Sequence, residues 1–348
     1  MNANIPTKQI SVPTVILANG VELPCVSLGT GFLVLKGDKV DDKNMPKQFA
    51  GLAPEKVFRQ VQVALESGIR SIETARIYRA HRPIGHVLGE WFRVGQLSRK
   101  DVFLTSKVFH GSAVSLATKN SHVWNLDELS PDQVTDAVTN EVEESLLDLN
   151  VGYIDLMLLH WPASAYNDQP KPIPLSPSTI HRDRRIAAWK VLEHYYAKGW
   201  IRAIGVSNFS EQHLDQLLQD GAKIVPMVNQ IEASLSVQYP KILEYCQNHR
   251  IACQAFSPLK RGMFMESNYG AQVLKDMAEK YSRTEAQIVL RYLIQKGYAI
   301  TFLSTSGERM VSNHDIFDFQ LTEEDMSILS GYAREGGNWG LATPYDFE

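Results

Sequence analysis

Hydrophobic and polar positions follow two alternating patterns along this chain. Short apolar runs of strand length, such as Ile154 to Leu159, are followed by stretches in which apolar residues recur every three or four positions. The helical period is clear after Pro54, where Val57, Val61 and Leu65 fall on one face. Because parallel strands that are buried on both faces read as continuous apolar runs, the alternation predicts repeated strand–helix units.

Eight such units can be counted. The strands are expected at residues 25–29, 69–72, 101–107, 154–160, 201–206, 225–230, 251–256 and 298–303. The helices are expected from 54 onward, at 83–94, 131–149, 184–198, 211–219 and 239–249, within 271–296, and after 307. Eight units without an internal linker favour a closed (β/α)8 TIM barrel over an open doubly wound sheet, so we expect a single barrel domain over residues 1–348.

The start of the chain supports this choice. An open sheet that binds a dinucleotide usually carries G-x-G-x-x-G after its first strand, whereas Gly29-Thr30-Gly31 runs on into Phe-Leu-Val. Before that strand, two short apolar runs within 15–24 flank Asn19-Gly20, the strongest short signal for a β-hairpin. The sequence therefore predicts a barrel with an N-terminal β-hairpin flap.

Composition narrows the range of partners. Of the 348 residues, 44% are hydrophobic, which allows a large core, and the formal net charge is -4. Lysines and arginines are spread rather than clustered, so no basic surface argues for nucleic acid or an anionic membrane. The first residues lack the order of a signal peptide, and no apolar run reaches the ~18 residues of a membrane span. We expect a cytoplasmic protein.

The three cysteines, Cys25, Cys246 and Cys253, are an odd and sparse set. Their spacing fits neither a metal site nor a disulfide framework, which agrees with a reducing compartment. We expect each to be a small buried residue rather than a reactive thiol, and we expect no metal site.

Candidate chemistry gathers where the expected strands end. In a barrel, the residues just past each strand share one open rim, and this rim would collect Glu73, Lys107, His160, Ser207, Asn208, Gln230, Phe256 and Ser304. Tyr78 follows five residues after Glu73. A phenol with an ordinary pKa of about 10 becomes a usable acid for a carbonyl oxygen when a neighbouring ammonium lowers that pKa. A structural salt bridge between Glu73 and Lys107, with His160 merely packed, is the alternative at this stage.

The chain resembles the aldo-keto reductase family over nearly its whole length. The matching stretches, in order, are Gly68 to Tyr78, Leu104 to Lys107, Tyr153 to Pro162, Ile201 to Phe209, Val228 to Glu232, Ala255 to Leu259, and Ser304 to Asn313. The resemblance implies that Tyr78 donates the proton, that Lys107 lowers its pKa, that Glu73 holds Lys107, and that His160 orients the carbonyl group.

The same resemblance implies a nicotinamide nucleotide as cofactor. Ser207, Asn208 and Gln230 would hold the carboxamide, and Phe256 would stack on the ring where the family more often has Tyr. Ser257 and Leu259 fall where the backbone approaches the pyrophosphate, and Ser304, Arg309 and Asn313 fall at the adenosine end. Substrate specificity is expected to rest on Phe32, Trp124, Trp161 and the loop 108–130.

Two residues depart from the family pattern. Glu73 stands where the family normally has Asp, which moves the carboxylate by roughly an ångström, a displacement that can cost up to about a hundredfold in rate. Leu303 stands where the family usually has a Lys that contacts the 2'-phosphate of NADPH. The guanidinium group of Arg309 can still bind this phosphate, so we expect NADPH as cofactor. Use of NADH is more plausible than for a typical member of the family.

The sequence therefore predicts NAD(P)H-dependent reduction of an aldehyde or ketone to an alcohol by a monomer or weak homo-oligomer. The rival prediction is a barrel that binds the nucleotide but catalyses little, acting as a redox-sensing or partner-binding module. A hydrolase barrel that uses Glu73 is the weakest alternative, because Lys107 would neutralise the carboxylate and no motif places a second acid.

Overall fold

Eight parallel strands close into a barrel in the computed structural model of this chain, which describes residues 12–31, 53–108, 129–162, 180–262 and 271–333. The barrel strands are β3 (Val26–Gly29), β4 (Ser71–Glu73), β5 (Phe103–Val108), β6 (Ile154–Leu159), β7 (Ile201–Ser207), β8 (Val228–Glu232), β9 (Ala252–Phe256) and β10 (Tyr298–Phe302). Each strand pairs with the next in sequence, and β10 pairs with β3 to close the ring. The predicted (β/α)8 fold is confirmed.

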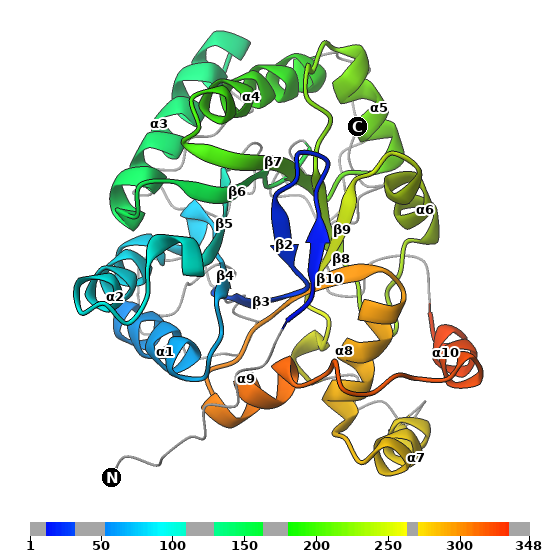
Figure 1. Cartoon of the computed structure of the whole chain (residues 1–348). Coiled ribbons are helices and arrows are strands. Elements are labelled where there is room, and N and C mark those ends of the chain that lie inside the picture. Colours follow the sequence, from blue (N-terminus) through cyan, green and yellow to red (C-terminus); the bar gives the residue numbers. More distant parts are fainter. Residues whose placement is uncertain (1–11, 32–52, 109–128, 163–179, 263–270, 334–348) are drawn as a thin grey trace.

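Helices form the outer layer of the barrel (Figure 1). They are α1 (Pro54–Glu66), α2 (His81–Arg93), α3 (Pro131–Leu149), α4 (Ile180–Ala197), α5 (Glu211–Gln219), α6 (Pro240–Asn248), α7 (Ala271–Tyr281), α8 (Glu285–Gln295), α9 (Gly307–His314) and α10 (Glu323–Ser330). Within the described residues, none of these helices is long and apolar enough to cross a membrane.

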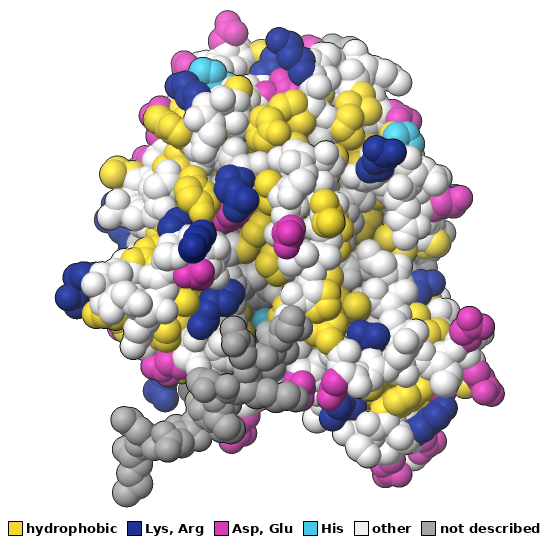
Figure 2. Space-filling model, viewed as in Figure 1, with side chains coloured by type: hydrophobic (Ala, Val, Ile, Leu, Met, Phe, Trp, Pro, Cys, Tyr) yellow, Lys and Arg dark blue, Asp and Glu magenta, His cyan; other side chains and the backbone are white. Residues whose placement is uncertain are grey.

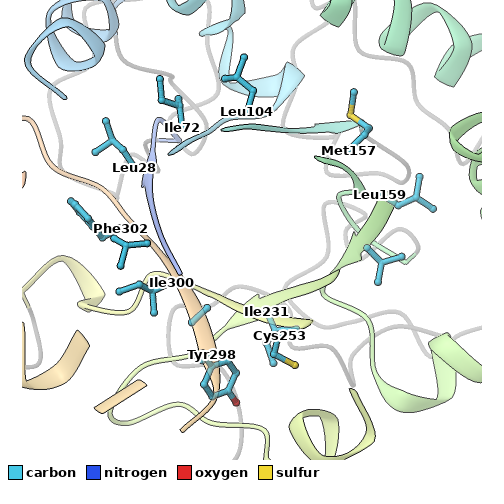
Figure 3. Packing of buried hydrophobic residues seen from close by; sticks show 14 of the residues in the cluster. Leu28, Ile72, Leu104, Met157, Leu159, Ile231, Cys253, Tyr298, Ile300 and Phe302 are labelled. Carbon is cyan, nitrogen blue, oxygen red and sulfur yellow. The ribbon is translucent and has the colours of Figure 1, made fainter. Parts of the chain in front are cut away.

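Strand alternation divides the buried side chains into two sets. Leu28, Ile72, Leu104, Met157 and Ile231 point away from the barrel axis toward the helices (Figure 3). The alternate positions point inward, because successive side chains of a strand face opposite ways. Inside the barrel, apolar residues fill the end where the strands begin, and polar residues gather where they finish. The end at which the strands finish therefore carries the polar side chains that a reaction would need.

A β-hairpin closes the end of the barrel at which the strands begin. It consists of β1 (Thr14–Ile16) and β2 (Glu22–Pro24), paired antiparallel as the Asn19-Gly20 signal predicted. Gly20 has φ 84°, a left-handed conformation that glycine adopts at little cost. The hairpin's apolar residues pack against interior side chains from the starts of several strands: Leu17, Val21 and Leu23 lie in one cluster with Phe103, Leu156, Ala203, Val228 and Ala299. The hairpin therefore covers the end of the barrel opposite the rim at which the strands finish.

Several element boundaries differ from the predicted ones, each for a local reason. The stretch Arg99–Asp101 is a short 3-10 helix capped by Ser98, so β5 begins only at Phe103. Pro226 has no N–H to give to a strand ladder, and β8 begins at Val228. The predicted helical stretch within 271–296 is two helices, broken near Ser282, where φ is 53°.

The three cysteines are free and buried, as predicted. Burial raises the pKa of the Cys25 thiol to about 11, so this thiol stays protonated at neutral pH. On the face of the molecule shown in Figure 2, basic and acidic side chains are interspersed.

Candidate active site

Four predicted side chains meet at the end of the barrel where the strands finish. Glu73 is the last residue of β4, Lys107 lies near the end of β5, and His160 directly follows β6. Tyr78 ends a short 3-10 helix, η1 (Arg76–Tyr78), which follows β4. Lys107 and His160 are only 1% and 7% exposed, so little water reaches these groups.

Glu73 and Lys107 form a direct ion pair between Glu73 Oε1 and Lys107 Nζ. Lys107 Nζ also donates to the backbone oxygen of Thr74 at 3.2 Å. Gly29, on the neighbouring strand β3, packs closely against this acid, because a Cβ at that position would lie 3.2 Å from Glu73 Oε2. Glu73 thus keeps the ion pair with Lys107.

The Tyr78 hydroxyl lies 3.3 Å from Lys107 Nζ, which donates to it. Its ring meets the His160 ring edge-on, with centroids 5.8 Å apart and an interplanar angle of 81°. Gly31 lies against the Tyr78 ring so closely that a Cβ would fall 2.6 Å from two ring carbons. The Tyr78 phenol therefore lies between the side chains of Lys107 and His160, and the backbone of Gly31 packs against its ring.

Burial controls the protonation of these groups. It raises the pKa of the Tyr78 phenol above its ordinary value, so the net shift is opposite to the lowering expected from Lys107. Burial also lowers the pKa of Lys107, and burial together with the Lys107 charge lowers that of His160. Loss of water outweighs the favourable contact of the phenol with Lys107. At neutral pH Tyr78 is a protonated donor and His160 a neutral imidazole.

The loop after β7 ties His160 to the predicted carboxamide site. Asn208 Nδ2 donates to the backbone oxygen of His160 at 3.0 Å and to Ser207 Oγ at 3.1 Å. Ser207 Oγ in turn donates to the backbone oxygen of Gln230 at 2.8 Å. Asn208 has φ 63°, a left-handed conformation that Asn adopts more readily than most residues. Three predicted residues from β7 and β8 are therefore in one network.

The acceptor oxygens of this network fit a carboxamide. Gln230 Nε2 donates to Gln254 Oε1 at 2.7 Å, which fixes the orientation of the Gln230 amide. Among the described residues, the side-chain oxygens of Asn208 and Gln230 accept no hydrogen bond, although both side chains are buried. A ligand amide that donates N–H groups would satisfy both oxygens.

The remaining predicted cofactor residues lie on the next two rim segments. Phe256 is the last residue of β9, and Ser257 and Leu259 follow it in a turn in which Ser257 has φ 53°. Ser304 follows β10, and its backbone oxygen accepts from Gln60 Nε2 at 2.9 Å. Arg309 and Asn313 lie on α9, whose first turn is capped by Ser306. Arg309 is exposed, whereas Asn313 is buried.

Comparison with known proteins agrees with this geometry. The model of the aldo/keto reductase family matches residues 39–333. The chain belongs to the aldo/keto reductase family. It is 34% identical to the glyoxal reductase of Bacillus subtilis (strain 168), over 92% of this chain and 93% of that protein. It is 30% identical to the methylglyoxal reductase of Escherichia coli (strain K12), over 84% of this chain and 91% of that one.

Solved structures of other aldo-keto reductases share the fold. The aldo-keto reductase of Bombyx mori in complex with NADP superposes with a TM-score of 0.71 at 29% identity, covering 93% of this chain and 94% of that chain. The chain is thus an oxidoreductase of a family whose members bind NADP(H) and reduce carbonyl groups.

The predicted substrate pocket of this aldo-keto reductase is only partly described. The Trp161 ring is stacked with the His160 ring, with centroids 6.0 Å apart. Phe32 and Trp124 lie outside the described residues, as does most of the loop 108–130. Within the described part of the chain, no group of three His, Cys, Asp or Glu side chains is placed to hold a metal ion.

Sequence reasoning missed three buried polar residues around the site. Gln60 lies on the apolar face of α1 and donates to the backbone oxygens of Gly29 and Ser304. Gln254 orients Gln230, and His81 contacts β5 beside Lys107. A polar residue on an otherwise apolar helix face, or at an inward strand position, is the signal that would have found the first two.

Proposed function

We propose that this chain catalyses the NAD(P)H-dependent reduction of an aldehyde or ketone to an alcohol, with Tyr78 as proton donor. The observation that carries the proposal is the position of the Tyr78 hydroxyl, 3.3 Å from Lys107 Nζ and beside the edge of the His160 ring. Membership of the aldo/keto reductase family supports the reaction class.

Each side chain has a distinct part in the proposed reaction. Neutral His160 can donate one N–H to the carbonyl oxygen and so hold it near the phenol. Tyr78 transfers its proton to that oxygen as negative charge develops there. Lys107 then stabilises the phenolate by hydrogen bonding, and Glu73 offsets the buried charge of Lys107.

A nicotinamide nucleotide bound at the rim would supply the hydride, from its C4 to the carbonyl carbon. We assign its carboxamide to Ser207, Asn208 and Gln230, because two of these side chains offer oxygens that accept no hydrogen bond among the described residues. Phe256, Ser257 and Leu259 are assigned to the ring and pyrophosphate, and Ser304, Arg309 and Asn313 to the adenosine end.

The similarity to glyoxal and methylglyoxal reductases favours small aldehydes among the substrates. The rival function is a nucleotide-binding module with little catalysis, and a measurement of turnover distinguishes it from an enzyme. We expect the purified chain to oxidise NADPH in the presence of a panel that includes both dicarbonyls, simple aldehydes and ketones. Nucleotide binding without turnover across that panel would favour the module.

Tyr78→Phe tests the assigned proton donor. The variant keeps the ring that packs on Gly31 but has no proton to give, so kcat should fall by at least about 100-fold. The dissociation constant for NADPH, measured by quenching of tryptophan fluorescence, should stay near that of the wild type. Retained turnover would show that another group delivers the proton.

Leu303→Lys tests the proposed preference for NADPH. Leu303 is 37% exposed beside Ser304, so a longer charged side chain fits without disturbing the core. We expect the ratio of kcat/KM for NADPH over NADH to rise by about 10-fold, equivalent to about 1.4 kcal/mol. Leu303→Met, which adds no charge, should leave the ratio unchanged. An equal ratio in the Lys and Met variants would place the 2'-phosphate elsewhere.

A further inference from the structure

Tyr78 and Lys107 come from separate elements that have to be held in register. Tyr78 ends η1, a 3-10 helix of three residues, and Lys107 belongs to β5. A helix this short has poor hydrogen-bond geometry and does not fix its own position. The 3.3 Å contact between Lys107 Nζ and the phenol therefore depends on whatever docks η1 against β5.

His81 provides such a contact. It is the first residue of α2, three positions after Tyr78, and is buried. Its Nε2 lies at hydrogen-bond distance, 2.9 Å, from Ser106 Oγ. Ser106 is fully buried and directly precedes Lys107 in β5.

The contact lies on the opposite face of β5 from the site. Because successive side chains of a strand face opposite ways, Ser106 points outward toward α2 when Lys107 points inward toward Tyr78. The segment that carries Tyr78 is thus attached to β5 on both faces, by His81 behind and by the phenol in front. Movement of α2 along the strand would change both distances together.

This contact is one anchor of the helix start, beside the ion pairs that Arg76 and Arg82 form with Asp148 on α3. Ala80, the N-cap residue of α2, makes no side-chain capping bond, and Arg79 before it has φ 55°, a conformation unusual for a non-glycine residue. Burial, with the nearby Arg76 charge, lowers the pKa of His81 to about 3. The imidazole is therefore neutral over the working range of pH, and the bond persists throughout it.

We infer that His81, through Ser106, is a positioning residue that sets the distance between Tyr78 and Lys107. The inference rests on the proposed function, since it assigns His81 a role only through those two groups. His81 contributes no proton to the reaction.

Three variants test this role: His81→Leu removes the hydrogen bond, His81→Gln keeps an amide nitrogen at similar reach, and Ser106→Ala removes the partner alone. We expect kcat to fall about 10- to 100-fold in the Leu and Ala variants, the range for a shift of about an ångström at a reacting group. The dissociation constant for NADPH and the KM for the carbonyl substrate should change little, and His81→Gln should recover most of kcat.

The double variant His81→Leu with Ser106→Ala should lose no more kcat than either single one, because both break the same contact. A wild-type kcat in Ser106→Ala, or additive losses in the double variant, would overturn the inference even if His81→Leu failed to fold. So would a lower melting temperature with unchanged kcat, which is the mark of a purely structural role. If the wild type shows no turnover, or if the Tyr78→Phe variant retains turnover, the result contradicts the proposed function rather than the role of His81.

Discussion

Glu73 pairs with Lys107 beside a glycine of the neighbouring strand. Gly29 leaves the space above β4 open, and the Glu73 carboxylate reaches Lys107 within it. From the sequence, a one-carbon change at this position is expected to lower the catalytic rate, because small displacements of reacting groups slow a reaction. The ion pair shows that the acid has kept its partner, so the departure from Asp does not by itself argue against catalysis.

Glu73→Gln should damage both activity and stability. The substitution leaves the Lys107 ammonium buried without its carboxylate, which costs about 3–5 kcal/mol in comparable buried pairs. We expect the free energy of unfolding in urea to fall by about that amount, and kcat to fall as Lys107 loses its proton. Glu73→Asp keeps the charge and should retain most of both. A Gln variant with the activity of the wild type would remove Glu73 from the mechanism.

For single residues, the sequence predicted which side chains meet at the site but not the direction in which their pKa values shift. The order of motifs placed Glu73, Tyr78, Lys107 and His160 on one rim, and the structure brings them together. Burial, which is a property of the assembled site and not of the motif, raises the pKa of Tyr78, whereas the motif pointed only to the opposing effect of Lys107. The contact of His81 with Ser106 joins two motifs that sequence reasoning treated separately.

At the level of elements, the hairpin β1–β2 contributes burial rather than chemistry. Leu23 is fully buried among interior residues of the barrel, at the end remote from Tyr78. Its side chain fills the space that the starts of the strands leave open. Residues at this end of a barrel usually serve stability, whereas the opposite end carries the reaction.

Leu23→Ala should therefore separate stability from activity. Deleting a fully buried leucine side chain costs about 2–5 kcal/mol, so the melting temperature should drop clearly. The kcat of the folded variant, measured well below its melting temperature, should equal that of the wild type. A proportionate loss of kcat would mean that the hairpin is coupled to the rim. Ile16→Ala, at an exposed position of the same hairpin, is the matched control and should change neither quantity.

Element type was predictable, but element boundaries were less so. The capping residues Ser130, Ser210 and Thr284 start their helices through side-chain bonds to the third helical residue, a signal visible in the sequence. Helix α2 has no such cap and begins at His81, two residues before the predicted Pro83. Its first residue contacts β5, a long-range contact that no local pattern contains.

For the whole molecule, stability should depend on pH through Glu232. This residue ends β8, is 4% exposed, and has a pKa raised by burial from 4.5 to about 7, against the opposing charge of Lys260. The folded chain therefore binds more protons than the unfolded chain between these two values. The contribution of this group is fully present below about pH 4.5 and is lost as pH rises to about 7, a loss of about 3 kcal/mol.

Urea unfolding across that range checks the sign. We expect the wild type to lose stability between about pH 5 and about pH 8 by more than the Glu232→Gln variant does, since Gln has no proton to lose. Other carboxylates titrate in both proteins, so the difference between the two slopes isolates Glu232. Parallel slopes would mean that Glu232 titrates normally in the folded chain.

The barrel itself was the most predictable level. Eight alternating units with ordered motifs leave few other topologies, because strand–helix–strand connections are short and of one hand. Phe32 and Trp124 lie outside the described residues, so the predictions for these two residues stay predictions. Loop conformation depends on specific contacts rather than on a repeating pattern, so residue spacing gives no guide to the shape of a substrate pocket.

The close approach of Gly29 to Glu73 also bears on how such proteins diverge. Any side chain at position 29 would occupy volume that the Glu73 carboxylate uses, and the same Cβ would approach Thr301 Oγ1 to 3.2 Å. Positions 29 and 73 are therefore coupled: a side chain at position 29 would require the Glu73 carboxylate and the Thr301 hydroxyl to shift by a few tenths of an ångström. A substitution at a residue with no side chain would in this way act on the ion pair of Glu73 with Lys107.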